Sequence, residues 1–216
     1  MKKKAIVTTK LPNAKTRERQ RALLEVAVAS VRSALSQGRL LVWVDEAMTT
    51  QRTVMTREYS NLRTNIQIDL KDFNIKTTAV VAAISSEHGI LLWKDYGKAV
   101  SSEDFVDFIK RLKGKAGKRQ LSLYLDNASI HRAKVVKSFC EAAGVELIFN
   151  PPYFPQGNSI ELLFAQQKRA FKALRTNQIV NGMKQDTLRT ITLSYEAVSN
   201  DHIRNCIAHT LKILGV

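Results

Sequence analysis

The chain has 216 residues, of which 44% are hydrophobic and 25% are charged, as in an ordinary folded protein. No apolar run is long enough to span a membrane, and the lysine-rich start lacks the apolar stretch of a signal peptide, so neither a membrane span nor secretion is expected. The 34 Lys and Arg residues against 19 Asp and Glu residues give a net charge of +15. This imbalance favours a polyanionic partner such as nucleic acid.

The predicted elements begin with a loose basic tail over 1–13. A helix follows over 15–36, where apolar residues recur at three- and four-residue intervals. Further on, apolar β-branched runs predict strands over 40–45, 77–85, 90–96, 121–126 and 145–150. Amphipathic segments predict helices over 101–114, 132–143, 159–174, 184–198 and 200–214. Residues 52–70 fit a hairpin or an irregular excursion, and the nearest break between domains lies at 176–184.

Three strands in a row followed by alternating helices and strands predict a mixed α/β sheet covered by helices on both sides. This is also the order of a ribonuclease-H-like fold. We therefore expect a five-stranded ribonuclease-H-like sheet over 40–175, with a basic tail and helix over 1–39 and a helical C-terminal extension over 176–216. The two cysteines, Cys140 and Cys206, have no metal-ligand or disulfide spacing, which fits a reducing compartment.

Two of the predicted strands end in an acid, Asp45 after the first and Asp126 after the fourth. If these strands are neighbours, their carboxylates lie close together at one end of the sheet. Two such charges repel each other unless a cation bridges them, and carboxylate oxygens suit Mg²⁺. Taken singly, either aspartate could equally be a turn former or a helix cap.

Glu161 is the candidate for a third acid, at the start of the helix that follows a loop containing Pro151, Pro152 and Pro155. Proline restricts itself and the residue before it, so this loop would hold the helix start in a fixed place. Three acids could hold two metal ions for phosphodiester cleavage. The alternative is structural, because Asn158 to Glu161 fits a capping box.

Two neighbouring residues leave alternatives open. Glu46 could replace Asp45 as a ligand, although neighbours on a strand face opposite ways. His131 fits the first turn of a helix better than a metal ligand, because imidazole suits softer metals.

Three motifs together resemble the mariner-type superfamily of DDE transposases: VDEAMTT at 44–50, LDNASIH at 125–131, and NPPYFPQGNSIELLFAQQK at 150–168. Thirty-four residues separate Asp126 from Glu161, as in one branch of that family. The sequence departs from the family pattern at Gln156-Gly157, at Ser159 and at Phe164, where the family has an acidic residue with Leu, Pro and Trp.

The resemblance implies a catalytic triad of Asp45, Asp126 and Glu161, which also binds Mg²⁺ or Mn²⁺, with two ions expected. It implies cutting and joining of double-stranded DNA at transposon ends and targets, in the nucleus of a eukaryote or the nucleoid region of a prokaryote, and it allows a homodimer. We assign DNA contacts to Lys168, Lys172 and His131.

Members of this family carry helix-turn-helix domains before the catalytic domain. Only 44 residues precede Asp45, with room for one helix and a tail, so we expect no sequence-specific recognition of transposon ends. A transposase or nuclease domain is the first hypothesis. The second is a DNA-binding remnant that no longer cuts, and a ribosomal or chromatin-type basic protein would explain the charge but not the three acids.

Overall fold

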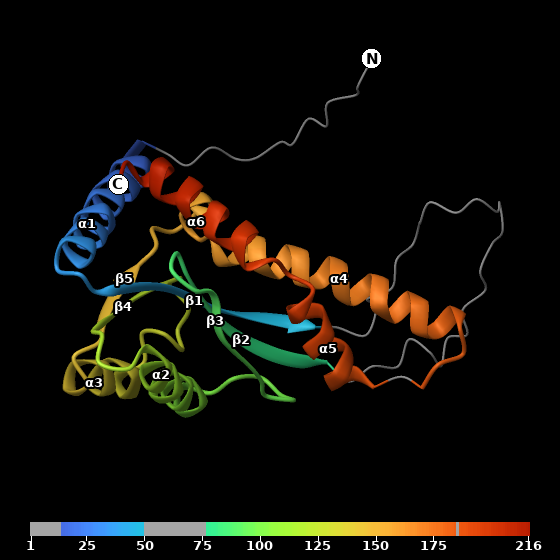
Figure 1. Ribbon diagram of the computed structural model, residues 1–216. Helices are drawn as coiled ribbons and strands as arrows, with labels where there is room; N and C mark the ends of the chain where they lie inside the picture. The colour runs from blue at the N-terminus through green and yellow to red at the C-terminus, as the bar shows by residue number, and fades with distance from the viewer. Residues whose placement is uncertain (1–13, 50–76, 185) are drawn as a thin grey trace, which may run out of the picture.

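The computed structural model describes residues 14–49, 77–184 and 186–216 (Figure 1). The expected tail over 1–13 and the ambiguous segment over 52–70 lie outside these ranges. The strands are β1 (Leu40–Thr49), β2 (Thr78–Ser85), β3 (Gly89–Asp95), β4 (Leu121–Leu125) and β5 (Glu146–Phe149). The helices are α1 (Ala14–Ser36), α2 (Ser102–Ala116), α3 (Lys134–Ala142), the 3-10 turn η2 (Pro155–Gly157), α4 (Ile160–Val180), α5 (Thr187–Glu196) and α6 (Asn200–Leu214).

The five strands form one mixed sheet in the order β3-β2-β1-β4-β5. Strand β1 pairs antiparallel with β2 and parallel with β4, which places it at the centre of the sheet. Figure 1 shows α2 and α3 on one face, and α1, α4 and α6 on the other. The predicted α/β class, the five strands and the terminal helices are thereby confirmed.

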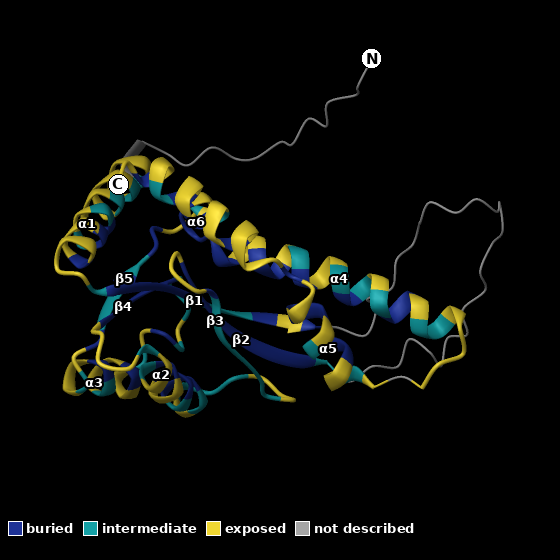
Figure 2. Ribbon diagram, viewed as in Figure 1, coloured by how far each residue is buried: buried dark blue, intermediate teal, exposed yellow. Residues whose placement is uncertain are grey.

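Strand β1 separates two apolar cores, because its successive side chains point to opposite faces. Leu41 and Trp43 pack with α1, α4, α5 and α6, whereas Leu40, Val42 and Val44 pack with α2 and α3. Figure 2 shows β1 and β2 as dark blue, buried along most of their length. Because this alternation continues along β1, the side chain of Asp45 lies on the α4 side of the sheet and that of Glu46 lies on the α2 side.

Several element boundaries differ from the predicted ranges by one to three residues, and two differ by more, in each case because of tertiary contacts. Strand β1 runs four residues past the expected end at Asp45, since β2 pairs with it as far as the Thr49–Thr78 step. Helix α4 continues to Val180, past the expected end at 174, and Arg175 and Thr176 on this extension are buried.

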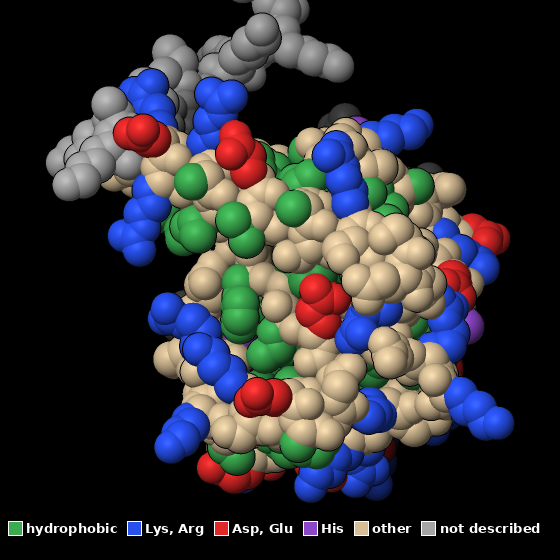
Figure 3. All heavy atoms as spheres, turned by 90° about the vertical axis from the view of Figure 1, so that its left-hand side faces the viewer, with side chains coloured by type: hydrophobic (Ala, Val, Ile, Leu, Met, Phe, Trp, Pro, Cys, Tyr) green, Lys and Arg blue, Asp and Glu red, His purple; other side chains and the backbone are tan. Residues whose placement is uncertain are grey.

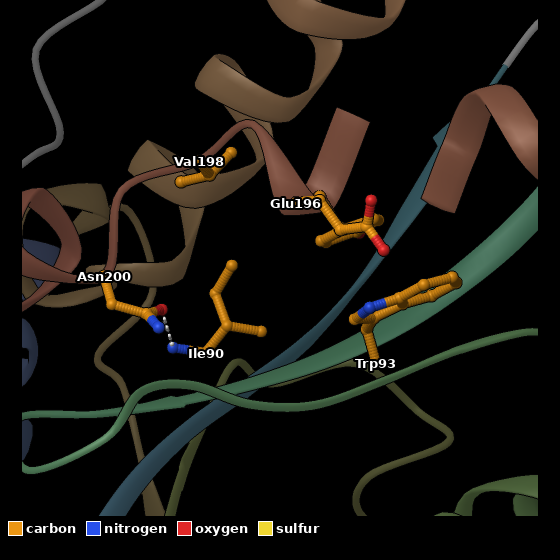
Figure 4. A pocket seen from close by; sticks show the side chains of 6 residues that line it. Ile90, Trp93, Glu196, Val198 and Asn200 are labelled. Atoms are coloured by element: carbon orange, nitrogen blue, oxygen red, sulfur yellow. Dashed lines mark hydrogen bonds between the residues drawn. The ribbon is translucent and has the colours of Figure 1, made fainter. Parts of the chain in front are cut away.

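The C-terminal helices complete the core on the α4 side of the sheet. Ile191, Ile203 and Ile207 join the same apolar cluster as β1 and α4. The side-chain oxygen of Asn200 accepts a hydrogen bond from the backbone N–H of Ile90 at 3.0 Å, so the start of α6 is fixed to the edge strand β3 (Figure 4). None of the helices among the described residues is long and apolar enough to cross a membrane.

Candidate active site

The strand register brings Asp45 and Asp126 to the same level of the sheet. Where β1 pairs with β4, the last pair is Trp43 with Tyr124. Asp45 lies two residues beyond Trp43, and Asp126 lies two residues beyond Tyr124. Because the two strands are parallel and adjacent, both carboxyl ends meet at one edge. The sequence-based expectation that these strands are neighbours is therefore confirmed.

Asp45 is half-buried, and its pKa is raised to about 7, first by burial and then by the charge of Asp126. Two hydrogen bonds oppose this rise: the backbone N–H of Glu46 donates to Oδ1 at 2.8 Å and Nδ2 of Asn158 donates to Oδ2 at 2.9 Å. Burial and a neighbouring like charge both disfavour an ionised carboxylate. The site therefore contains a negative charge that a bound cation would stabilise.

His131 lies between Asp126 and Glu46 and is fully buried. Its Nδ1 lies 2.7 Å from Oδ1 of Asp126, and its Nε2 lies 3.2 Å from Oε1 of Glu46. Burial alone would lower the pKa of His131, but the two carboxylates raise it to about 10, so both ring nitrogens donate. The imidazolium in turn holds the pKa of Asp126 below its usual value.

Two expectations for His131 are wrong. The residue precedes α3, which begins at Lys134, so it does not lie in the first turn of that helix. The expected DNA contact is also wrong, because a fully buried ring packed 4.6 Å from the ring of Phe105 presents no surface to DNA. The expectation that Glu46 faces away from Asp45 agrees with the structure, because Glu46 turns toward His131 on the α2 side.

The proline loop is anchored to the Trp43–Tyr124 pair directly below the acids. The indole N–H of Trp43 donates to the carbonyl oxygen of Gly157 at 3.1 Å, and the Tyr124 hydroxyl donates to Oδ1 of Asn150 at 2.8 Å. Nδ2 of Asn150 then donates to the carbonyl oxygen of Phe154 at 2.8 Å. Side chains of the adjacent strands β1 and β4 thus fix both ends of the loop.

The start of α4 differs from the capping box expected from the sequence. Ser159 occupies the cap position with helical backbone angles, and its side chain makes no capping hydrogen bond. Asn158 donates to Asp45 instead, and the backbone N–H of Glu161 donates to the carbonyl oxygen of Asn158 at 3.2 Å. The side chain of Glu161 is therefore not part of a capping box. The hydrogen bond from Asn158 to Asp45 connects the residues before α4 to β1.

The residues present suit a hard divalent cation in their chemistry. The predicted ligands are carboxylates, the pKa of Asp45 is raised, and Oδ1 of buried Asn158 has no hydrogen-bond partner among the described residues. Glu161 is exposed on the first turn of α4. Within the described residues, however, no three acidic, histidine or cysteine side chains are already gathered as a metal site.

The predicted DNA-contacting lysines lie further along α4, where Lys168 is exposed and Lys172 is half-buried. Neither forms an ion pair with any residue in the described ranges, so both ammonium groups can meet an anion. Figure 3 shows Lys and Arg side chains (blue) spread widely over another face of the molecule, with fewer acidic ones among them. Basic side chains thus outnumber acidic ones on this face.

Asn158 is the site residue to which sequence reasoning gives the wrong role, that of a helix cap. The signal that could have corrected it was the spacing: Asn158 comes three residues before Glu161, on the loop expected to reach the strand ends. Glu46 was considered only as a replacement ligand, and its contact with His131 required the arrangement of β1 against the turn before α3.

Comparison with known proteins identifies the family and the fold. The family model described as DDE superfamily endonuclease matches residues 40–184. The fold is similar to that of the catalytic domain of Mos1 mariner transposase, with a TM-score of 0.61, 14% identity, and coverage of 97% of this chain and 95% of that chain. No curated protein matches the sequence.

Two larger Mos1 assemblies give similar values. A Mos1 transposase paired-end complex with left transposon end has a TM-score of 0.69 and 14% identity. A Mos1 mariner paired end complex with Mn has a TM-score of 0.67 and 12% identity. Both comparisons cover 100% of this chain and 65% of the Mos1 chain, so this chain spans less than two thirds of those relatives.

Proposed function

Because the chain belongs to the DDE superfamily of endonucleases, we propose that it is the catalytic domain of a DNA transposase that cleaves and joins DNA strands with divalent metal ions. The observation that carries this proposal is the register of β1 and β4, which sets Asp45 and Asp126 side by side with a raised pKa at Asp45. Ionised Asp45, partly buried beside the negative charge of Asp126, is unfavourable to the fold. Such an arrangement is typical of a functional site.

We assign each residue a separate task. Asp45, Asp126 and Glu161 would hold Mg²⁺ or Mn²⁺, with two ions expected, and the bound ions would supply an activated water and charge stabilisation for phosphodiester cleavage. His131 fixes the Asp126 carboxylate through its Nδ1, and Asn158 fixes that of Asp45 through its Nδ2. On this proposal, the loop that Asn158 anchors would carry Glu161 toward the two aspartates.

Double-stranded DNA is the proposed substrate. The net charge of +15, together with Lys168 and Lys172 on α4, the helix whose first turn carries Glu161, favours contact with phosphates next to the acids. The names of similar Mos1 structures include a transposon end, paired-end complexes and Mn. We propose that the present chain likewise binds transposon ends and Mn²⁺ or Mg²⁺, and that it acts as a homodimer on paired DNA ends.

Glu161→Gln tests the proposal. Glu161 is exposed and takes no part in a capping box. The substitution should therefore leave the free energy of unfolding, measured by denaturant titration, within about 0.5 kcal/mol of the parent value. Gln offers a neutral oxygen where a charged ligand is needed, so Mg²⁺-dependent plasmid nicking should fall at least about 100-fold. Glu103→Gln, at an exposed acid in the first turn of α2, is the matched control and should nick as the parent does. If Glu161→Gln nicks DNA normally, Glu161 is not a ligand.

A second function is supported by the exposed position of Glu161 outside any preformed metal group in the described residues. On this alternative, the chain binds DNA without cutting it. The parent protein would then bind duplex DNA in a gel-shift assay but show no nicking at any Mg²⁺ or Mn²⁺ concentration.

A further inference from the structure

A groove next to the catalytic acids is lined by residues that the proposed mechanism does not use. It has a volume of about 460 Å³ and lies between α1, the turn after β4 and the proline loop. Its lining includes Arg19 and Gln20 of α1, Asn127 and Arg132 beyond β4, and Tyr153 of the loop. A volume of this size falls within the range of small-ligand sites. The smaller pocket of Figure 4, of about 160 Å³, is lined instead by residues that pack α5 and α6 on β3.

Tyr153 is doubly unusual within this groove. It is 85% exposed, although a large aromatic ring normally gains stability from burial. Among the described residues it is also the non-glycine residue with a positive φ, at 60°. A bulky residue in this region of backbone space is strained, and such strain concentrates at ligand-binding positions. The loop therefore displays an aromatic ring that has no packing role in the protein itself.

The backbone that carries Tyr153 is held on both sides. Nε2 of Gln20 donates to the carbonyl oxygen of Pro152 at 2.9 Å, and the side-chain amide of Asn127 donates to the carbonyl oxygen of Asn150. The groove is thus built by α1 and by the residue directly after Asp126. The backbone that carries the ring is therefore fixed relative to the active site.

The charges of the groove are positive. Arg19 and Arg132 are both exposed, and neither guanidinium forms an ion pair within the described part of the chain. Arg132 is close enough to Asp126 for its charge to help lower the pKa of that carboxyl. The arginines supply phosphate-binding groups, and the ring of Tyr153 supplies a flat surface on which a base can stack.

We propose that this groove binds one unpaired nucleotide of the DNA strand that enters the active site, with its base on Tyr153 and its phosphate at Arg132 and Arg19. The assignment rests on the proposed function for the identity of the nucleic acid. A paired base already has both faces stacked on its neighbours, so a single exposed ring selects an unpaired one. The groove would hold a frayed or extruded nucleotide beside the phosphate that is cut.

The test measures binding without metal, so that it is independent of cleavage. Fluorescence anisotropy with a fluorescein-labelled oligothymidylate of about eight nucleotides, and with a duplex of equal length, is carried out in EDTA. Tyr153→Asn removes the ring while keeping a residue that tolerates positive φ, so the fold should be retained. We expect about tenfold weaker binding of the single strand and little change for the duplex. Tyr153→Phe should bind as the parent does.

The arginine is tested in the same way. Arg132→Ala should weaken single-strand binding and flatten its salt dependence by about 0.7 in log–log slope, the value for one phosphate contact. The control is Lys118→Ala, which removes an exposed cation just before β4, at the end of that strand opposite Asp126. It should leave the single-strand affinity and its salt dependence unchanged. Each Arg132→Ala result is compared with its denaturant midpoint, so that a folding defect is recognised.

Three results would overturn the proposal: parent-like single-strand binding by Tyr153→Asn, equal losses for single strand and duplex, or a Tyr153→Phe defect as large as that of Tyr153→Asn. These outcomes are separate from the failure of the proposed function. If the parent does not nick DNA but Tyr153→Asn loses single-strand affinity, the groove assignment stands and the nuclease proposal fails. If the parent nicks DNA and all variants bind the single strand equally well, the nuclease proposal stands and the groove assignment fails.

Discussion

At the residue scale, the site combines two charge arrangements that respond to pH in different ranges. Asp45 is ionised at a free-energy penalty because it is partly buried beside Asp126. His131 is protonated at a gain because two carboxylates bracket its ring. Among the described residues, Asp45 is paired with no cationic side chain, whereas Asp126 and Glu46 share the imidazolium of His131.

Asp45→Asn should stabilise the metal-free protein, and increasingly so as pH rises. The folded-state pKa of Asp45 is about 7, above the ordinary 3.8, so the folded state binds an extra proton between these values and loses stability as pH rises through 7. Asn cannot ionise, so the variant should gain on the order of 2 kcal/mol over the parent at pH 8 and much less at pH 4. Denaturant midpoints in EDTA at both pH values measure this.

Added Mg²⁺ should reverse that order, raising the midpoint of the parent but not of Asp45→Asn. Asp201→Asn, at an exposed carboxylate on α6, is the control and should not reproduce the pH-dependent gain. A variant that unfolds, or that nicks DNA at the parental rate, would contradict the role of Asp45.

His131→Asn should abolish the loss of folding stability that the parent shows at alkaline pH when His131 deprotonates. The folded-state pKa of about 10 exceeds the ordinary 6.5, so the contribution of His131 is complete below pH 6.5 and is lost as pH rises through 10. The parent should therefore lose stability between pH 7 and 10, while the variant is less stable at pH 7 but flatter across this range. His209→Asn, at an exposed histidine of α6, should follow the parent curve. Equal slopes for parent and His131→Asn would show that His131 is not protonated between the carboxylates.

At the scale of elements, β1 and the loop before α4 act together. Strand β1 supplies Trp43 and Asp45 on the same face, so one side chain anchors the loop while the other meets Asn158. Gly157 makes this approach feasible. A Cβ there would lie 2.6 Å from Oδ1 of Asn150 and 2.9 Å from the ring of Phe154. Oδ1 of Asn150 is held by the Tyr124 hydroxyl, and the backbone of Phe154 is held by Nδ2 of Asn150.

Gly157→Ala should therefore displace the loop, weakening the Trp43 and Tyr124 hydrogen bonds and shifting the first turn of α4, which carries Glu161. We expect a loss of about 2 kcal/mol in unfolding free energy, as for other overpacked sites, and at least about tenfold slower Mg²⁺-dependent nicking. Gly114→Ala in α2 is the control, because a Cβ at that position would meet nothing within 4 Å and Ala favours helix. If Gly157→Ala retains both stability and nicking, the loop does not position Glu161.

At the scale of the whole molecule, the distribution of charge governs the association with DNA. The sheet separates α2 and α3 from the helix that carries Lys168 and Lys172 (Figure 1). Binding of a long polyanion to a surface with +15 net charge depends on released counterions, but only contacted lysines contribute to the salt slope.

Lys172→Ala should flatten the plot of log affinity against log salt for duplex DNA by about one unit, the value for one lost phosphate contact. Lys115→Ala removes the same charge from α2, on the other face of the sheet, and should leave the slope nearly unchanged. Filter binding between about 50 and 200 mM salt gives both slopes. Equal effects of the two substitutions would show that the net charge, and not the α4 surface, determines binding.

The sequence by itself determined the order of the elements, the mixed α/β class and the two candidate aspartates, because apolar periodicity and the acids that interrupt apolar runs are local properties of the chain. It could not determine which way Asn158 turns. A cap and a contact with Asp45 are both compatible with the local pattern, and only the register of β1 against β4 decides between them.

The same limit explains His131 and Tyr153. His131 became a buried bridge because α2 contributes Phe105 and β1 contributes Glu46, two segments remote from it in the sequence. Tyr153 gained a groove only where α1 packs against the proline loop. Burial, charge coupling and strain arise from contacts between distant segments, so tertiary structure alone decided the roles of these residues.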